Sequence, residues 1–255
     1  KGVPFTITLN KGESFALRAS GMSGADHLCN TIIKSDKPVA VNYTDDSVAG
    51  PGVDMVGDQL VPVELAGINY LAVKGGGSVE KAYIFPTVDN TSVYAKGIKV
   101  ATMNAGDKYM HVLADTVTHI TSDKPIIVLQ ITSKGTELGA ALLPAIDCTG
   151  SREIAYKPAS SADPIVTLVT KTENIGNFKV NGTSYLLPPS VFRPVAGYPG
   201  WSYTVKTLGA VEILRIKNST GYFHMGVFDN ISNSCGFGYF SNYNVVPLGS
   251  VSNKN

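Results

Sequence analysis

The stretch TIIKSDKPVAVNY (residues 31–43) recurs as THITSDKPIIVLQI (residues 118–131), with Ser-Asp-Lys-Pro kept and apolar residues after the proline in both copies. Proline has no backbone N–H, so a sheet tolerates it at the first residue of a strand or at an edge, where no ladder bond is lost. Ser and Asp side chains hydrogen-bond the local backbone and close turns. The tetrapeptide therefore predicts a turn that ends one strand and opens the next. The alternative, that Asp36 and Asp123 belong to ligand or metal sites, lacks any surrounding cluster of ligating residues.

The similarity extends beyond the tetrapeptide. Gly12-Glu13-Ser14-Phe15, Gly106-Asp107-Lys108-Tyr109 and Gly200-Trp201-Ser202-Tyr203 recur at equal intervals. GDQLVPVEL (57–65) resembles GAALLPAID (139–147), and TVDNTSVYAKG (87–97) resembles TKTENIGNFKVNG (170–182). The third copy replaces the tetrapeptide with KNSTG (217–221). We interpret this as three copies of a unit of roughly 80 to 95 residues. The predicted repeats are residues 1–79, which lack the opening strands, then 80–160 and 161–255.

The local pattern is that of β-structure. Segments rich in β-branched and aromatic residues alternate with turn-forming ones, and no apolar pattern keeps helical spacing over a dozen residues. The predicted strands include FTITL (5–9), VAVNY (39–43), AYIF (82–85), IIVLQI (126–131), IVTLV (165–169), VEILRI (211–216) and FHMGVF (223–228). The expected fold is all-β, with three tandem antiparallel β-sandwich or jelly-roll-like repeats packed together. A propeller-like arrangement of three large units is the alternative. Gly75–Gly77 is interpreted as a linker between repeats.

Composition restricts the class of protein. The chain has 255 residues, of which 44% are hydrophobic and only 16% charged, against roughly 25% in an ordinary soluble protein. This favours an exported protein. A net charge of +1 with scattered basic residues offers no source of attraction to phosphate, so no nucleic-acid partner is expected. No apolar run is long enough to span a membrane, and export would depend on a signal sequence that this sequence does not contain.

Three cysteines, Cys29, Cys148 and Cys235, exclude a disulfide framework and CxxC zinc spacing. At most one bridge forms, for which Cys148 and Cys235 are candidates, and free thiols are the alternative.

Motifs for catalysis are missing. The sequence has no GxSxG, HExxH, P-loop, GxGxxG or EF-hand pattern. Asp115 and His119 would share one face of a strand, but a general base or a metal ion needs more converging groups. The acids Asp45, Asp46, Asp54 and Asp58 could hold calcium, although their spacing fits no known ion loop and solvated loop acids are expected. We predict no enzyme activity, no metal and no cofactor. A hydrolase with an unfamiliar site is the outlying alternative.

Aromatic residues are the candidates for ligand contact. Trp201 is the only tryptophan and follows the turn GYPG, which contains Tyr198. The tail GYFHMGVFDNISNSCGFGYFSNYN (221–244) adds Tyr239 and Tyr243. Outward aromatic rings on a neutral surface stack on sugars or on a protein partner, whereas inward ones belong to the core. The predicted ligand-binding residues are Trp201, Tyr198, Tyr239 and Tyr243, with packing as the alternative.

Two regions carry a family resemblance. TIIKSDKPVAVNY followed by GDQLVPVELAGINY, together with TGYFHMGVFDNISNSCGFGYFSN, resembles the N-terminal domain family of IgG Fc-binding proteins, which also occurs in large secreted proteins of Bacteroidetes and other bacteria. The resemblance covers most of residues 5–245, although the last copy lacks Ser-Asp-Lys-Pro. It implies a non-catalytic module at the cell surface or outside the cell that contacts host proteins, mucus or glycans. It transfers no ligand residues and does not imply that immunoglobulin is bound. A carbohydrate-binding module of a secreted glycan-utilisation protein is the alternative.

Overall fold

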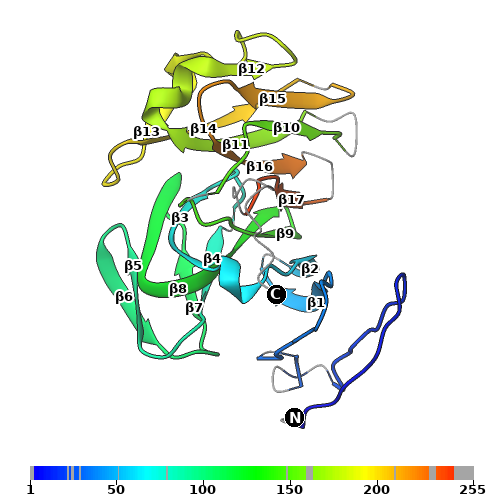
Figure 1. The fold of residues 1–255 in the computed structure, drawn as a ribbon. Helices are drawn as coiled ribbons and strands as arrows, with labels where there is room; N and C mark the ends of the chain where they lie inside the picture. The colour runs from blue at the N-terminus through cyan, green and yellow to red at the C-terminus, as the bar shows by residue number, and fades with distance from the viewer. Residues whose placement is uncertain are drawn as a thin grey trace, which may run out of the picture. The chain divides into compact units, whose positions relative to one another are not determined.

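The computed structural model shows the all-β, antiparallel chain that the sequence predicts (Figure 1). It describes residues 3–21, 23, 26–28, 30–50, 52–78, 80–147, 149–158, 163–209, 211–229 and 234–243. The chain divides into two compact units, Lys1–Lys37 and Pro38–Asn255. Helical structure in the described residues is limited to the short 3-10 turns η1 (Val63–Leu65), η2 (Thr172–Asn177) and η3 (Pro189–Val191).

The first unit has an extended backbone and no regular strand in its described residues. The prediction of a strand over residues 5–9 is therefore wrong, because no described segment supplies the ladder bonds that define a strand. The turn at residues 10–13 is closed twice: the Glu13 N–H donates to the Asn10 carbonyl (3.0 Å), and the Asn10 N–H donates to the Glu13 carboxylate (2.8 Å). The Phe5 and Phe15 rings meet edge to face across this turn, yet both remain more than half exposed.

The second unit is organised around one long strand, β8 (Val117–Lys134). Its seven-stranded sheet has the order β6-β5-β8-β4-β7, with β3 and β9 also paired to β8. The other strands are β3 (Gly67–Val73), β4 (Lys81–Pro86), β5 (Thr91–Ala95), β6 (Ile98–Met103), β7 (Tyr109–Val112) and β9 (Glu137–Leu142). Residues 117–122 of β8 pair with β3 and β5, whereas residues 126–134 pair with β4 and β9, apart from one further pair of Ile126 with Gly67 of β3. The strand thus changes partners at its middle, and the sheet curls there.

The second Ser-Asp-Lys-Pro stands at this change of partners. The prediction that it is a turn between two strands is wrong, because residues 122–125 continue inside β8. Its groups instead fix neighbouring segments: Asp123 accepts the Ser92 N–H (2.7 Å), and the Pro125 carbonyl accepts the Thr87 N–H (3.1 Å). The first copy is a bend at residues 36–37, and the following strand begins only at Asn42.

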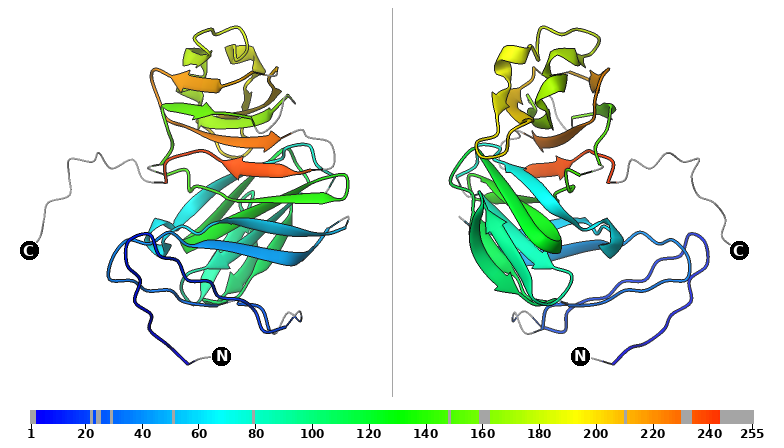
Figure 2. Two further views of the ribbon diagram at one scale, coloured as in Figure 1. Left: turned by 90° about the vertical axis from the view of Figure 1, so that its right-hand side faces the viewer. Right: turned by 60° about the vertical axis from the view of Figure 1, so that its left-hand side comes forward.

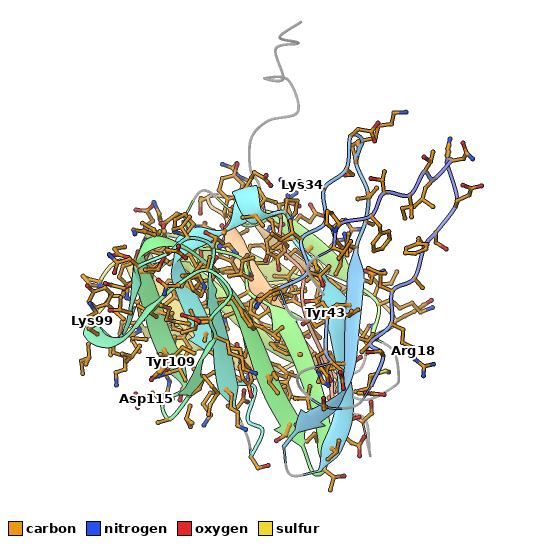
Figure 3. The ribbon with its side chains drawn as sticks, turned by 90° about the horizontal axis from the view of Figure 1, so that it is seen from below. Arg18, Lys34, Tyr43, Lys99, Tyr109 and Asp115 are labelled. Atoms are coloured by element: carbon orange, nitrogen blue, oxygen red, sulfur yellow. The ribbon has the colours of Figure 1, made fainter. Side chains whose placement is uncertain are left out.

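An antiparallel hairpin of β1 (Asn42–Ala49) and β2 (Val53–Gln59) lies beside β9. Asp54 accepts the Leu138 N–H and Asp58 accepts the Leu142 N–H, each at 2.7 Å. The prediction that these acids lie in a solvated loop is therefore wrong: residues four apart in a strand share one face, and both carboxylates cover the outer edge of β9. Tyr43 of β1 is among the side chains between this hairpin and the seven-stranded sheet (Figure 3).

Two smaller sheets form the rest of the second unit. One has the order β13-β14-β11-β16-β17 and the other β10-β15-β12. Their strands are β10 (Glu153–Tyr156), β11 (Ile165–Lys171), β12 (Phe178–Val180), β13 (Arg193–Pro194), β14 (Trp201–Thr207), β15 (Leu214–Asn218), β16 (Phe223–Asp229) and β17 (Gly236–Tyr239). Figure 2 shows β17, β9 and the β1–β2 hairpin following one another through this unit, in agreement with their contacts.

The strand pairings occur twice. Strands β3 and β5 pair with β8, as β10 and β12 pair with β15. Strand β4 also pairs with β8, as β11 pairs with β16. The β4–β7 and β8–β9 pairs likewise correspond to the β11–β14 and β16–β17 pairs. The difference is that β15 and β16 are separate strands where β8 is continuous. Between them Asn218 accepts the N–H groups of Thr220 and Gly221 (both 3.0 Å) and closes a turn. This duplication supports the sequence repeat. The predicted boundaries near residues 79 and 160 lie outside the described residues, and the division into three repeats stays a prediction.

The glycines that revealed the repeat share one backbone conformation. Gly12, Gly106 and Gly200 have φ of 88°, 91° and 85°, in the left-handed region where a side chain is strained. The Asn104 turn before β7 also repeats the bonding of the Asn10 turn, since the Asp107 N–H donates to the Asn104 carbonyl and the Asn104 N–H donates to the Asp107 carboxylate. The sequence similarity therefore reflects equal turns.

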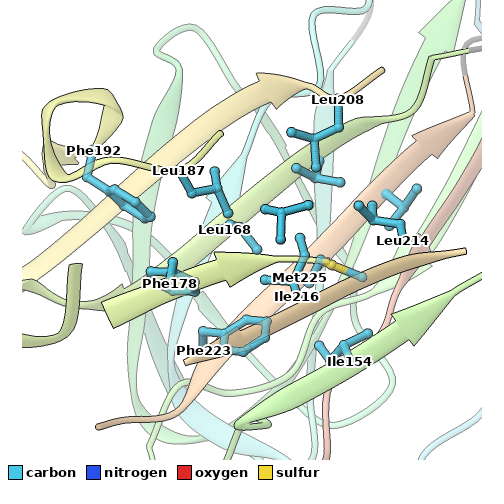
Figure 4. Close-up of a cluster of buried hydrophobic side chains, with 13 residues drawn as sticks. Ile154, Leu168, Phe178, Leu187, Phe192, Leu208, Leu214, Ile216, Phe223 and Met225 are labelled. Atoms are coloured by element: carbon cyan, nitrogen blue, oxygen red, sulfur yellow. The ribbon is translucent and has the colours of Figure 1, made fainter. Parts of the chain in front are cut away.

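Each duplicated half has its own core. The cluster of the C-terminal half is drawn in Figure 4 and centres on Phe178 and Phe223, which are 1% and 0% exposed. The seven-stranded sheet buries Tyr70, Ile84 and Ile120 in the same way. Fully burying a side chain of this size contributes about 1.5 to 3 kcal/mol.

The Gly75–Gly77 loop is held against the sheet by a buried carboxylate. Glu80 is 4% exposed and accepts the Gly75 N–H (3.0 Å), the Gly77 N–H (3.1 Å) and the Thr132 hydroxyl (2.9 Å). A Cβ on Gly77 would lie 2.2 Å from the Ser133 carbonyl oxygen. The prediction that this run is a linker is wrong, because its glycines allow the backbone to approach the sheet.

Cys235 carries a free, half-buried thiol, and burial raises its pKa to about 11. Cys29 and Cys148 lie outside the described residues, and so does a Cys148–Cys235 bridge. In the described part of the chain, no helix has the length and apolar character needed to cross a bilayer.

Candidate ligand-binding site

The two duplicated halves meet at a buried apolar cluster, which we call the seam. It consists of Leu71 and Val73 from β3, Ile146 from the segment before β10, Val169 from β11 and Val195 after β13. Val117, Tyr198, Trp201 and Tyr203 pack against the seam and remain partly exposed. The seam thus brings aromatic side chains to the surface between two sheets.

Three rings form a stack at the seam. His119 of β8 lies on Tyr198 with ring centroids 3.8 Å apart, and Tyr198 lies 6.3 Å from Trp201 at an interplanar angle of 14°. The turn before β14 positions the last two rings, since the Tyr198 N–H donates to the Val195 carbonyl (3.2 Å) and Gly197 and Gly200 have positive φ. Pairing of Trp201 with Lys171 of β11 fixes the start of the strand. Two sheets therefore hold the stack from opposite sides.

An open pocket of about 230 Å³ lies at the same junction. Its wall comes from both halves: the β5–β6 turn, the start of β8, the segment at β13 and strand β14. The lining residues are Lys96, Asp115, Thr116, Val117, Pro194, Ala196 and Tyr203. Because Val117 and Tyr203 also pack on the seam, the pocket and the aromatic stack share a floor. Drug-sized sites have about 300 to 1,000 Å³, so this one suits a small group or the end of a chain.

The two charged groups of the pocket are paired with each other. Lys96 Nζ donates to Asp115 Oδ2 at 2.5 Å, and this hydrogen bond holds the pKa of the exposed Asp115 carboxyl below its ordinary value. Lys96 itself adopts φ of 53° in its turn with Gly97. Burial lowers the pKa of His119, and burial followed by the charge of Asp147 raises the pKa of Tyr198. At neutral pH the site presents a cation, a carboxylate and neutral rings.

The structure brings together two of the four predicted ligand-binding residues. Tyr198 and Trp201 lie at the seam, each partly exposed. Tyr239 instead packs against the core of the seven-stranded sheet, where burial raises its pKa. Tyr243 donates its hydroxyl to the Leu142 carbonyl (2.6 Å). In this structure the hydroxyl groups of both tail tyrosines point into the protein, and their role in ligand contact stays a prediction.

The sequence did not predict the two charged residues of the pocket, Lys96 and Asp115. Lys96 and Asp115 are separated along the chain and meet only because β5 and β8 are adjacent. The spacing of Asp115 and His119 predicts that they share one face of a strand, but His119 points to Tyr198 and Asp115 to Lys96. A usable signal was the match between the Lys96-Gly97 and Asn181-Gly182 turns, which marks the hairpin that presents Lys96. No group of three or more His, Cys, Asp or Glu that fits a metal ion exists among the described residues.

Fold and site together define an all-β module with an aromatic surface site at the junction of two duplicated halves. The chain belongs to the IgGFc binding protein family, whose sequence profile matches residues 1–228. This is a family of extracellular binding modules. No curated protein matches the sequence significantly. A solved structure, an anti-sigma factor domain-containing protein from Clostridium clariflavum, is similar over 73% of this chain and 92% of that chain, with 8% identity and a TM-score of 0.21, which is too weak to bear on fold or function.

Proposed function

We propose that this chain is a non-catalytic adhesion or scaffolding module of the cell surface or the extracellular medium, and that the seam site is where it contacts host proteins, mucus or glycans. Membership of the family supports a binding role and an extracellular setting. The observation that carries the proposal is the partly exposed Tyr198–Trp201 pair beside an open pocket. Exposed tyrosine and tryptophan dominate the energetics of protein contacts because they bring large apolar area with a polar tip.

A carbohydrate-binding module is the second candidate. The pocket combines aromatic and apolar walls with one cation and one carboxylate, Lys96 and Asp115. Sugar rings stack their C–H faces on aromatic rings, while their hydroxyls both donate and accept hydrogen bonds. The small volume favours a terminal sugar over an internal one. The two candidates share a site and differ in whether the ligand is the glycan or the protein part of a host glycoprotein.

One screen separates these candidates. The chain would be applied to a glycan array, to purified mucin before and after enzymatic deglycosylation, and to IgG Fc as a protein probe. Binding to intact mucin that survives deglycosylation supports a protein ligand, and binding that disappears supports the carbohydrate alternative. Measurable turnover of a glycan or protein, with no binding to any probe, overturns the non-catalytic proposal.

Matched variants locate the contact. Trp201→Ala and Lys96→Ala remove one aromatic and one polar wall. Tyr185→Ala is the control, because Tyr185 is 73% exposed and lies outside the seam. We expect the first two variants to lose binding at least tenfold and the control to bind as the wild type. Equal binding by all three would place the ligand elsewhere on the chain.

A further inference from the structure

Strand β1 is paired on one edge where its counterparts are paired on two. The second half of β8 lies between β9 and β4, and β16 lies between β17 and β11. By the Ser-Asp-Lys-Pro match, residues 39–44 correspond to residues 126–131 of β8. Among the described strands, β1 pairs with β2 alone. The strand equivalent to β4 and β11 is thus absent from this place in the described structure.

Burial differs in the same way. Ile126 of β8 and Phe223 of β16 are fully buried at 0% exposure, whereas the matching Val39 is 54% exposed. One face of β1 is apolar, because Tyr43 packs inward against the cluster that contains Leu129. An exposed edge next to an apolar face is a template for adding a strand.

We propose that residues 39–44 form an acceptor edge for an extended strand of a partner protein. The added strand runs antiparallel to β1, as β4 runs to β8, with apolar side chains at alternate positions. Main-chain hydrogen bonds supply affinity in this mode of recognition and alternate side chains supply selectivity. This surface is separate from the seam, so the inference does not depend on the proposed function.

The acidic residues of β1 favour one direction of the partner strand and a basic residue at its beginning. In the complete copy, Lys81 at the start of β4 is opposite Ile131, the counterpart of Thr44. On β1 the next two residues are Asp45 and Asp46. A basic residue at the beginning of the added strand would therefore lie next to this acidic end of β1. Opposite charges across strands stabilise the pair and like charges destabilise it.

The ladder geometry identifies the N–H groups that face the partner. The Leu60 N–H donates to the Val41 carbonyl, so Val41 and Leu60 form a hydrogen-bonded pair. Because such pairs alternate along an antiparallel ladder, the N–H groups of Asn42 and Thr44 point away from β2. Proline is tolerated at such a position on an edge, but it removes the donor that an added strand needs.

The probe is a peptide with the sequence of residues 81–87, KAYIFPT, acetylated at its N-terminus and labelled with fluorescein at its C-terminus. Fluorescence anisotropy is measured against the whole chain. We expect saturable binding, at least tenfold weaker binding to the Thr44→Pro variant and unchanged binding to Thr44→Val, which keeps the N–H. A peptide with Lys81→Glu should bind about two- to fivefold more weakly than the original.

Far-ultraviolet circular dichroism checks that Thr44→Pro is folded, and the Lys81→Glu peptide decides the question if it is not. No saturable binding of the original peptide, or equal binding of both peptides, overturns the proposal. Light scattering after size-exclusion chromatography tests whether a second copy of the chain occupies this edge instead. A dimer of the wild type that Thr44→Pro abolishes would mean that a second copy of the chain, not another protein, covers this edge.

Discussion

The imidazole of His119 stacks on the phenol of Tyr198 with ring centroids 3.8 Å apart. His119 lies in β8, the central strand of the seven-stranded sheet, whereas Tyr198 lies in the turn that precedes β14. One ring contact therefore joins the two duplicated halves and also builds the wall of the ligand site. Binding and the junction between the halves are linked through these two residues.

Tyr198→Ala removes this contact and should weaken both properties, whereas Tyr198→Phe keeps the ring and should preserve stability. Stacked rings contribute about 0.5 to 1.5 kcal/mol beyond the area they bury. We expect Tyr198→Ala to lower the free energy of unfolding in urea by about 1 to 2 kcal/mol. Equal stability of the two variants would show that the stack does not hold the halves together.

The two Ser-Asp-Lys-Pro copies allow the same substitution to be compared in two settings. Asp123 accepts the Ser92 N–H, and losing this bond through Asp123→Ala should cost about 0.5 to 1.5 kcal/mol. Asp36 is exposed in its bend, so Asp36→Ala should leave stability unchanged within about 0.5 kcal/mol. Urea unfolding of the two variants measures both values. A larger loss for Asp36→Ala would contradict the assignment of the structural role to the second copy.

Glu80 should carry a pH-dependent part of the stability. Burial raises the pKa of its carboxyl above the ordinary value of 4.5, against the opposing effect of its hydrogen bonds. The folded state therefore holds this proton more tightly than the unfolded chain does. The contribution is present in full below pH 4.5 and is lost as the pH rises through the raised pKa. Glu80→Gln should remove this dependence from a series of urea midpoints.

Glu80→Ala tests the structural role of the same side chain. It leaves the Gly75 and Gly77 N–H groups and the Thr132 hydroxyl without their acceptor and opens a cavity. We expect a loss of about 2 to 4 kcal/mol at every pH. A loss below about 0.5 kcal/mol, the range of ordinary surface substitutions, would mean that the loop does not need its carboxylate.

His224 should make the protein sensitive to acid. The ring is 2% exposed, and burial lowers its pKa from 6.5 to about 4. Because the folded state favours the neutral ring, this contribution is complete above pH 6.5 and is lost as the pH falls toward 4, by about 3 kcal/mol in total. His224→Gln should lose less stability than the wild type between pH 7.5 and pH 4. Parallel stability curves would contradict the assignment.

Turn chemistry and strand periodicity were enough to predict the all-β class. The glycines that suggested the repeat, Gly12, Gly106 and Gly200, do share the same positive φ, while the division into three repeats stays a prediction. The course of β8 was not predictable in this way. Asp123 and Pro125 have the chemistry of a turn, yet the residues on either side of them are paired: Ser122 with Val93 of β5, and Ile126 with Pro86 of β4. Tertiary pairing decided between a turn and a continuous strand.

The candidate site was half predictable for a related reason. Trp201 and Tyr198 were identified by residue type and by the turn between them. Lys96 and Asp115 carry no local signal, since their proximity depends on the pairing of β5 with β8. Conversely, Tyr243 is of a residue type that is common in binding sites, but its hydroxyl donates a hydrogen bond to the Leu142 carbonyl at the end of β9, far away in sequence.

Trp201 is the only tryptophan of the chain, so the tryptophan emission of the protein reports on the seam site alone. The most direct test of the account is therefore a fluorescence titration of the whole chain with mucin oligosaccharides and with deglycosylated mucin peptides that lack tryptophan. We predict a saturable change in emission with one of the two ligands, lost in Lys96→Ala and retained in Lys99→Ala, a control on the same hairpin but outside the pocket. A ligand that binds the chain while the emission of Trp201 stays unchanged would contradict the account.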